Sequence, residues 1–513
     1  MPIPVIDLFA GPGGLAEGFS SVLDEQGTRA FDIRLSIEKD AHAHQTLKLR
    51  AFIRQFPLGT IPADYYDFLE QRITIEELYR RFPVQYDKAI GEAWQATLGQ
   101  TSEAEIDERV TSQLEGAAQW VLIGGPPCQA YSLAGRSRVG GISAQDNRVH
   151  LYKEYLRIIA RFQPSVFVME NVKGLLSAKV EGEQMFERIM QDLRAPGTVF
   201  PEFECPDYNI YSLVTTQVEK NSDYLIRSED YGIPQRRHRV ILIGVRSDLG
   251  AVPESLVPRP AVSLASVIGT LPAIRSGLYR ESTGSELVVK DGTVKKKRNY
   301  RPLIDSEELW QSLMLRYMDE LKQSFRSKGL DIANLPTRAG LTGREFFPSG
   351  DFAVLPGHPL HQWFTDSRLR GLNHHHSRSH LSIDLKRYLF ASLYAREFGN
   401  FPRMEDYREF GEDLLPDHEN AESGKFNDRF RVQLPGQPAT TITSHISKDG
   451  HYFIHYDPAQ SRSLTVREAA RVQTFPDNYF FCGSRTQQFH QVGNAVPPYL
   501  AYQIAEITKA LFD

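Results

Sequence analysis

Cysteine is scarce in this sequence, and its spacing excludes two common kinds of scaffold. The three cysteines, Cys128, Cys205 and Cys482, lie far apart, and none belongs to a Cys-x-x-Cys pair. A disulfide framework or a structural zinc site needs closely spaced ligands. The histidines at 374–376 with His380 come nearest to a metal site, but consecutive histidines point in different directions. We therefore expect neither disulfides nor a bound metal.

Long apolar runs are absent as well. No segment of about 18 apolar residues occurs, and Met1 leads directly into a strand-like segment without a secretory signal. We find no internal repeat. The composition, 41% hydrophobic and 24% charged, is typical of a globular protein. The sequence thus predicts a cytoplasmic protein that has no membrane partner.

An overall excess of positive charge is also lacking. With 59 Lys+Arg against 64 Asp+Glu, the net charge is −5, which is weakly against a nucleic-acid partner. One stretch departs from this balance, because Lys-Lys-Lys-Arg at 295–298 is followed by Tyr300 and Arg301. Such a stretch is as often a solvated loop as a nucleic-acid contact, so charge alone leaves both interpretations open.

What the sequence does contain is an alternation of short apolar strands with helices. Strands are predicted at 5–9, 33–38, 121–123, 166–169 and 240–243, with helical patterns at 15–23 and 151–162. This order is typical of an α/β fold, in which helices cover both faces of a mostly parallel sheet.

The length of 513 residues favours two or more domains. We predict a first domain over 1–250, interrupted by a polar, helical insertion at 51–118. A second, smaller domain over 251–459 reads as irregular, because it is rich in proline, glycine, histidine and aromatic residues.

A glycine-rich turn follows the first predicted strand, in the segment Asp7–Gly14. Glycines at such a turn let a ligand approach the backbone, and an acidic residue that ends the second strand, here Glu38, can hold ribose hydroxyls. Glycine turns are common, so this signal is weak by itself. The phosphate-binding spacing G-x-G-x-x-G is absent, which favours a ligand without a pyrophosphate, such as S-adenosylmethionine.

The segment Gly124–Ser132 follows a buried strand and contains Cys128 after two prolines. Open α/β folds place their sites at the carboxyl ends of the strands, and a rigid turn there favours a reactive cysteine over an inert core one. Glu170 ends the next strand, where a carboxyl group would stand beside Cys128. A strand-end glutamate is usually just solvated, so the pairing is only suggestive.

Three further segments stand out. Arg237 and Arg239 precede a later strand and are spaced to point the same way, although an ordinary basic strand entry would look similar. The other two are Arg462–Arg471 and Gly493–Pro498, the latter opening a final helix.

Taken in this order, these segments resemble the motif set of the DNA (cytosine-5)-methyltransferase family over about 1–45, 120–246 and 460–508. The resemblance implies a Rossmann-like, S-adenosylmethionine-dependent methyltransferase fold, completed by 460–513. Residues 251–459 would form the target-recognition domain. The sequence as a whole also resembles bacterial methyltransferases that are encoded with phage-defence systems of the DISARM type.

The resemblance implies site residues of three kinds. The catalytic residues are Cys128, Glu170, Arg237 and Arg239. The cofactor contacts are Asp7, Phe9, Ala10, Gly11, Gly13, Gly14, Glu38, Pro126, Leu151, Asn494, Ala495 and Val496. The DNA contacts are Gln129, Ser132, Arg136, Arg138 and Thr441, the first four lying in a loop expected to close over a flipped base.

The chemistry explains these residue types. C5 of cytosine attacks a sulfonium methyl only after a thiolate has added to C6, which is the role expected of Cys128. Glu170 would protonate N3 and accept the exocyclic amine, and Arg239 would bind O2 of the base. The partners implied are double-stranded DNA and restriction or phage-defence proteins, and we expect a monomer.

Two alternatives stay open at this point. Related enzymes of the same fold methylate cytosine in tRNA, although a large second domain favours duplex DNA. A non-catalytic DNA-binding scaffold is the other, but it would be expected to lack Cys128 or Glu170, and both are present.

Overall fold

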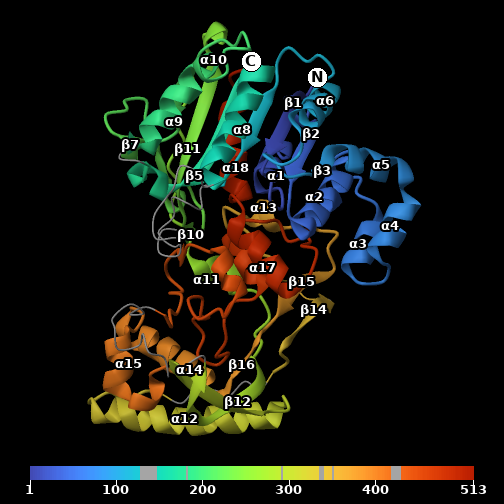
Figure 1. Cartoon of the computed structure of the whole chain (residues 1–513). Helices are drawn as coiled ribbons and strands as arrows, with labels where there is room; N and C mark the ends of the chain where they lie inside the picture. Colours follow the sequence, from blue (N-terminus) through green and yellow to red (C-terminus); the bar gives the residue numbers. More distant parts are fainter. Residues whose placement is uncertain are drawn as a thin grey trace. The chain divides into compact units, whose positions relative to one another are not determined.

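The computed structural model describes residues 1–127, 147–180, 183–290, 293–333, 340–348, 350, 352–416 and 429–513. These residues form two compact units (Figure 1). Unit 1 comprises Met1–Val262 with Gln473–Asp513, and unit 2 comprises Ser263–Val472. The borders therefore lie at 262 and 472, whereas the sequence placed them at 250 and 459, and residues 460–472 pack within unit 2.

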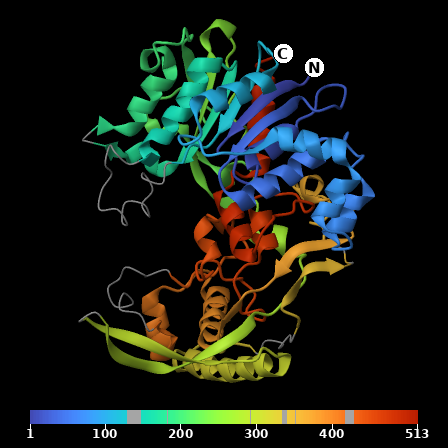
Figure 2. The ribbon, with the colours of Figure 1, turned by 45° about the vertical axis from the view of Figure 1, so that its right-hand side comes forward.

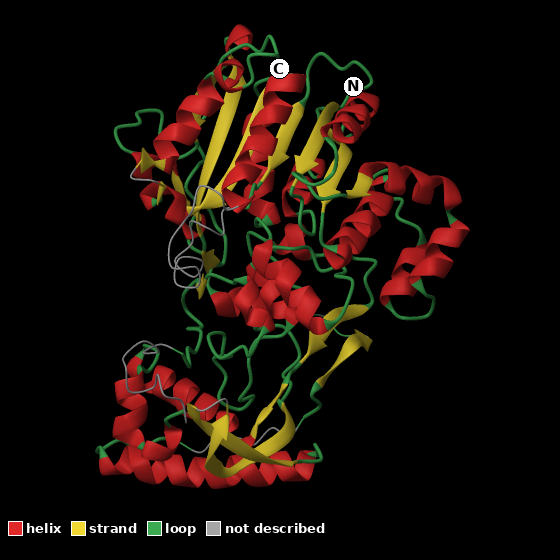
Figure 3. Ribbon diagram, in the orientation of Figure 1, coloured by secondary structure: helices red, strands yellow, loops and turns green. Residues whose placement is uncertain are grey.

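Unit 1 is built on one sheet with the strand order β3-β2-β1-β4-β5-β11-β8, in which β9 also pairs with β11 (Figure 3). The first five strands are parallel, whereas β11 runs antiparallel to β5, β8 and β9. The predicted α/β fold is confirmed. The strands are β1 Ile3–Leu8, β2 Phe31–Glu38, β3 Ala93–Gln95, β4 Val121–Gly124, β5 Val166–Val172, β8 Tyr208–Ser212, β9 Leu225–Arg227 and β11 His238–Arg246.

Helices pack on both faces of this sheet because its strands carry apolar side chains on both faces. Buried residues such as Leu8, Leu122 and Phe167 share one core with Val110 of α6 and Ile159 of α8. In Figure 2, the teal helices of this core lie in front of the sheet. The helices around the sheet are α1 Gly14–Ser20, α2 Ala41–Arg54, α6 Glu103–Leu114, α8 Asn147–Phe162, α9 Met185–Arg194, α10 Pro196–Val199, α17 Arg485–Asn494 and α18 Pro498–Lys509. Short strands β6 Lys179–Val180, β7 Glu183–Gln184 and β10 Gln235–Arg236 complete unit 1.

The insertion at 51–118 is only partly helical. It contains α3 Ala63–Leu69, α4 Ile75–Arg81 and α5 Pro83–Glu92, followed by α6, whose first turn is capped by the Ser102 hydroxyl. It also contains β3, which pairs in parallel with β2 and forms the edge of the central sheet. A strand of three residues is too short to show an alternating pattern, so the sequence did not reveal it.

Unit 2 is more regular than the sequence predicts. Helices α12 Glu307–Ser327, α14 Ser382–Phe398 and α15 Met404–Phe410 enclose a core of their own, which includes Trp310 and Tyr388. Its strands are β12 Gly277–Lys290, β13 Thr293–Pro302, β14 Gly343–Pro348, β15 Gly371–His376, β16 Ser379–Leu381 and β17 Ala439–Thr440. The remaining helices are α11 Leu264–Ile268, α13 His361–Phe364 and α16 Val466–Val472.

The histidine cluster belongs to the interior of unit 2. The His375 ring lies 3.0 Å from the Thr465 hydroxyl and 2.8 Å from the Pro272 carbonyl oxygen. Burial lowers the pKa of His374 and of His375 to about 4, so both rings are neutral at physiological pH. Within the described residues, no helix is long and apolar enough to cross a membrane.

Candidate active site

The predicted catalytic and cofactor residues of unit 1 lie at the carboxyl ends of its parallel strands. Phe9 follows β1, Glu38 ends β2, Pro126 follows β4, and Glu170 lies near the end of β5. Because parallel strands end at the same edge of a sheet, this topology gathers side chains that are far apart in the sequence.

The glycine turn after β1 has a left-handed backbone at several positions. Phe9 has a φ of 57°, Gly11 of 57° and Gly13 of 91°. A left-handed conformation costs a residue with a side chain roughly 1–2 kcal/mol, so the surrounding structure must hold Phe9 in place. A Cβ built on Gly11 would meet nothing within 4 Å, so the turn is open there. That open space suits a ligand that approaches the backbone.

Gly14, another predicted cofactor contact, makes a close contact within the protein. A Cβ at this position would lie 2.3 Å from the carbonyl oxygen of Val496. Gly14 therefore allows the residues before α18 to pack against α1, and its space is taken by protein and not by a ligand. Ala495 and Val496 are both buried at this contact, whereas Asn494 is exposed at the end of α17.

Glu38 connects the end of β2 to the glycine turn. Its carboxylate accepts a hydrogen bond from the Gly11 amide at 2.8 Å and from the Asp40 amide at 2.7 Å. Burial raises the pKa of Glu38, and the two amide hydrogen bonds oppose that rise. Each carboxylate oxygen keeps a second lone pair that can accept a ribose hydroxyl, so this residue fits the predicted cofactor.

Asp7 precedes the turn inside β1 and is fully buried. Among the described residues, neither of its side-chain oxygens has a hydrogen-bond partner. Burial raises the pKa of Asp7 well above its usual value, which favours the neutral carboxyl. An unpartnered polar group at the base of the turn is consistent with a ligand site, because such groups are rare in folded proteins.

A buried assembly that the sequence did not reveal supports the same turn. The Tyr479 hydroxyl donates a hydrogen bond to the carbonyl oxygen of Pro12, inside the turn. The guanidinium of Arg50 lies 4.5 Å from the centre of the Tyr479 ring and forms a buried ion pair with Glu17 of α1. Tyr65, from the insertion, donates to the Asn478 carbonyl at 2.7 Å. Only long-range folding brings these residues together, and no local sequence signal marks them.

Glu170 and Arg239 form the centre of the predicted catalytic group. Antiparallel pairing of β5 with β11 places them on neighbouring strands, and Arg239 Nε lies 2.7 Å from Glu170 Oε1. The other carboxylate oxygen faces the backbone at Gly125, where a Cβ would lie 2.9 Å from Oε2. A side chain at Gly125 would therefore displace the Glu170 carboxylate, which stands beside the turn that leads to Cys128.

The turn after β4 is anchored from β5. The amide of Asn171 donates to the Pro126 carbonyl at 3.4 Å, and Pro126 is buried. Cys128 itself lies outside the described residues, as do the predicted DNA contacts Gln129, Ser132, Arg136 and Arg138.

Arg237 is 2% exposed and does not share the setting of Arg239. Its Nη1 donates to the Gly493 carbonyl at 3.3 Å, which joins the residue before β11 to the last turn of α17. Burial, aided by the charge of Arg239, lowers the pKa of Arg237 well below its usual value. Arg237 is thus a structural link as well as a nearby charge.

Two further predicted contacts, Leu151 for the cofactor and Thr441 for DNA, have few described neighbours that bear on these roles. Leu151 of α8 is half-buried, and a Cβ on Gly99, in the turn after β3, would lie 3.3 Å from it. Thr441 is half-buried in unit 2, directly after β17. The backbone just before it is held by Gln433, which accepts a hydrogen bond from the Thr440 amide at 2.9 Å.

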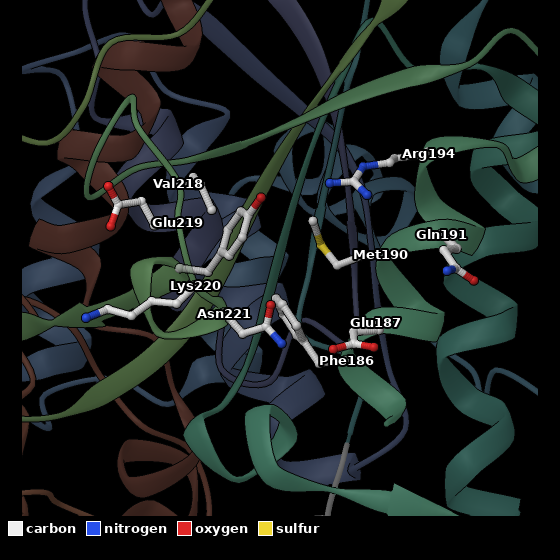
Figure 4. Close-up of a pocket in the computed structure, with 10 residues that line it drawn as sticks. Phe186, Glu187, Met190, Gln191, Arg194, Val218, Glu219, Lys220 and Asn221 are labelled. Atoms are coloured by element: carbon white, nitrogen blue, oxygen red, sulfur yellow. The ribbon is translucent and has the colours of Figure 1, made fainter. Parts of the chain in front are cut away.

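The other cysteines are poor nucleophiles. Burial raises the pKa of Cys205 to about 11 and that of Cys482 to about 11, so both are thiols at neutral pH. A hollow of about 340 Å³ in unit 1 lies elsewhere, between α9 and the segment 218–224 (Figure 4). Its lining, which includes Arg194 and Tyr224, contains none of the predicted site residues.

Comparison with known proteins points to one family. Residues 77–510 match the family described as C-5 cytosine-specific DNA methylase. The chain is 31% identical to the type II methyltransferase M.Bpa9945I of Bacillus paralicheniformis, over 99% of both chains. It is 25% identical to the type II methyltransferase M.DdeI of Desulfomicrobium norvegicum, over 99% of this chain and 89% of the relative. Among solved structures, a candidate DNA modification methyltransferase encoded within a prophage (E. coli) aligns with a TM-score of 0.52 and 20% identity over 99% of both chains, which shows a shared fold.

Proposed function

This chain belongs to the C-5 cytosine-specific DNA methylase family, and from that premise we propose that it methylates a cytosine flipped out of a specific duplex DNA sequence, with Cys128 as the covalent nucleophile. Its activity as a DNA (cytosine-5)-methyltransferase of the type II kind follows from the family. The flipped base and the covalent adduct are our proposal.

One observation carries the proposal. Arg239 holds one oxygen of Glu170 at 2.7 Å, while the other oxygen faces Gly125, three residues before Cys128. A carboxylate that is fixed at one oxygen and open at the other can engage one edge of a base. Within this arrangement Glu170 would meet N3 and the exocyclic amine, and Arg239 would meet O2.

The steps follow from these groups. The Glu170 carboxyl donates a proton to N3, which makes C6 electrophilic. The thiolate of Cys128 forms a bond to C6, and the electron pair of the C5–C6 double bond becomes available at C5, which takes the methyl group. A base then removes the C5 proton, and the carbon–sulfur bond breaks as the ring regains its double bond. Enzymes of this kind generally use S-adenosylmethionine, which supplies an electrophilic methyl group.

The residues of unit 1 fit that cofactor. We propose that Glu38 holds the ribose hydroxyls and that the open backbone at Gly11 lies against the ligand. Phe9, Asn494 and Leu151 would line the remainder of the site. The supporting assembly around Tyr479 would keep the turn in its left-handed conformation, and the unpartnered carboxyl of Asp7 lies at its base.

A mechanism-based trap tests the chemistry. Duplex DNA with 5-fluorocytosine at the target should form an adduct that survives denaturing electrophoresis, because fluorine cannot leave as a cation when C5 would normally lose its proton. We expect the adduct to require S-adenosylmethionine and to map to the peptide that contains Cys128. Cys128→Ser should form no adduct and lose methylation, whereas the control variants Cys205→Ser and Cys482→Ser should keep both. An adduct on either control cysteine would overturn the mechanism.

We also propose that the protein marks host DNA against a partner nuclease or within phage defence, since the relatives named above are type II methyltransferases. Bisulfite sequencing of DNA from expressing cells should show one methylated sequence. Methylation of tRNA but not of duplex DNA would instead favour the RNA-modifying alternative.

A further inference from the structure

The two long strands of unit 2 form a ribbon that extends beyond its sheet (Figure 2). Strand β12 pairs with β13 from Arg280–Pro302 to Lys290–Thr293, but it pairs with β16 only over Gly277–Arg280. The segment from 281 to 301 is named here the ribbon, and its described residues, 281–290 and 293–301, are therefore two-stranded. A two-stranded ribbon is marginally stable in water without a packed face, so its solvent exposure calls for an explanation.

One face of the ribbon is apolar and exposed. Leu287 and Val289 are each 74% exposed, and residues two apart on a strand point to the same side. Arg298 belongs to this face too, because it is the register partner of Ser285, two residues before Leu287. Nothing among the described residues of unit 2 covers the side chains of Leu287 and Val289. Exposed neighbouring apolar residues on a projecting element are typical of a contact surface.

The ribbon is also basic in a chain that is acidic overall. Its basic residues outnumber its acidic ones, whereas the whole chain has a net charge of −5. Two of the acidic side chains are already paired, since Glu286 binds Lys297 at 3.0 Å and Glu281 binds Arg301. The basic residues are Lys290, Lys295, Lys296, Lys297, Arg298 and Arg301, and the acidic ones are Glu281, Glu286 and Asp291.

The base of the ribbon is stiffened. The Arg280 guanidinium lies 4.7 Å from the ring centre of Tyr279 and 4.0 Å from that of Tyr300, on the opposite strand. A bulge between Ser282 and Gly284 follows, with Gly284 at a φ of 116°. Bulges bend a ribbon and increase its twist, so the segment beyond it has a set direction.

We propose that the ribbon enters a groove of duplex DNA, with Leu287 and Val289 against base edges and the basic side chains on phosphates. The major groove is wide enough for a two-stranded β-ribbon, and apolar side chains distinguish thymine there through its methyl group. Phosphate contacts would position the ribbon, and the apolar face would contribute to sequence choice. This inference rests on the proposed duplex DNA substrate and identifies the element that reads it.

The test compares the full chain with a Leu287→Ser/Val289→Ser variant. We expect the ratio of cognate to non-cognate duplex affinity, measured by fluorescence anisotropy, to fall about tenfold, in line with the loss of one or two base contacts. Bisulfite sequencing should show relaxed choice at one or two positions of the site. Leu355→Ser, at a side chain that is 66% exposed in the same unit, is the matched control and should change neither.

Two further measurements separate the possible failures. Repeating the binding assay in the Cys128→Ser background removes catalysis, so a wrong covalent mechanism would leave the ribbon result intact. Unchanged affinity ratio and unchanged methylated sequence in the double variant would overturn the inference. Sedimentation of both proteins addresses the other occupant, because a dimer that the double variant dissociates would assign this face to a second copy of the chain.

Discussion

The two units differ in where they place the residues that we assign to function. In unit 1, Glu170 and Glu38 stand at the ends of buried parallel strands, and each is fixed by hydrogen bonds or an ion pair to a neighbour. In unit 2, the aromatic core is buried around α12 and α14, while the ribbon carries its apolar and basic residues in solvent. Bond-making chemistry needs a fixed geometry, whereas sequence recognition can be carried by a projecting element that adapts to its partner.

The sharpest way to break this comparison is Glu170→Gln. The amide keeps the shape but cannot donate a proton to N3, so we expect the methylation rate to fall by about 10²–10⁴-fold. Calorimetry should show unchanged binding of S-adenosylmethionine, and the methylated sequence should stay the same. Arg236→Gln, at an exposed neighbour, is a suitable control. A change of sequence preference in Glu170→Gln would mean that unit 1 also selects the site.

Glu38→Ala tests whether the cofactor depends on unit 1 alone. It removes a carboxylate that would make charge-assisted hydrogen bonds worth about 1.5–3 kcal/mol, so the dissociation constant for S-adenosylmethionine should rise roughly 10–100-fold. Since its amide hydrogen bonds also shape the turn, Glu38→Gln serves as a partial rescue and should weaken binding less. An unchanged dissociation constant in the alanine variant would place the ribose acceptor elsewhere.

Replacing Lys297 and Arg298 by Gln tests whether unit 2 contacts the phosphates of DNA through the ribbon. Loss of two phosphate contacts should lower affinity severalfold for all duplexes alike and reduce the salt slope of binding by about 2. The affinity ratio between cognate and non-cognate DNA should hardly change. A slope equal to that of the unaltered chain would mean that these side chains of β13 are solvated and do not contact DNA.

The smallest expected effect belongs to Tyr479→Phe. The variant keeps the ring beneath Arg50 but loses the hydroxyl that donates to Pro12, so cofactor binding should weaken about fivefold, as for one lost hydrogen bond. Because this is a positioning role, the KM for S-adenosylmethionine should rise while kcat and DNA affinity stay the same. Tyr502→Phe, on the partly exposed side of α18, is the control. A fall in kcat alone would contradict the assignment.

The sequence predicted unit 1 better than unit 2 for a physical reason. Strands at 121–123, 166–169 and 240–243 were found because strands that are buried on both faces are continuous apolar runs, and they correspond to parts of β4, β5 and β11. The 21-residue helix α12 was missed because proline- and glycine-rich neighbours dominated the composition of its region. Its buried Trp310, Met314 and Tyr317 do follow helical spacing.

The candidate site shows the same limit. Glu38, Cys128 and Glu170 were predicted from strand ends, where topology alone indicates proximity, although Cys128 lies outside the described residues. The contact of Tyr479 with Pro12 was not, because it joins residues at opposite ends of the sequence. The antiparallel direction of β11, which brings Arg239 to Glu170, likewise depends on the path of the whole chain.

The composition of unit 1 from two segments also bears on protein synthesis. The turn after β1 is made before unit 2, whereas Tyr479 and Val496, which support this turn, follow the whole of unit 2. A nascent chain that has completed unit 2 therefore has its recognition element before its cofactor turn is supported. Products that stop short of 473 would contain unit 2 but lack the support of this turn, so unit 1 can be completed only after unit 2 has been made.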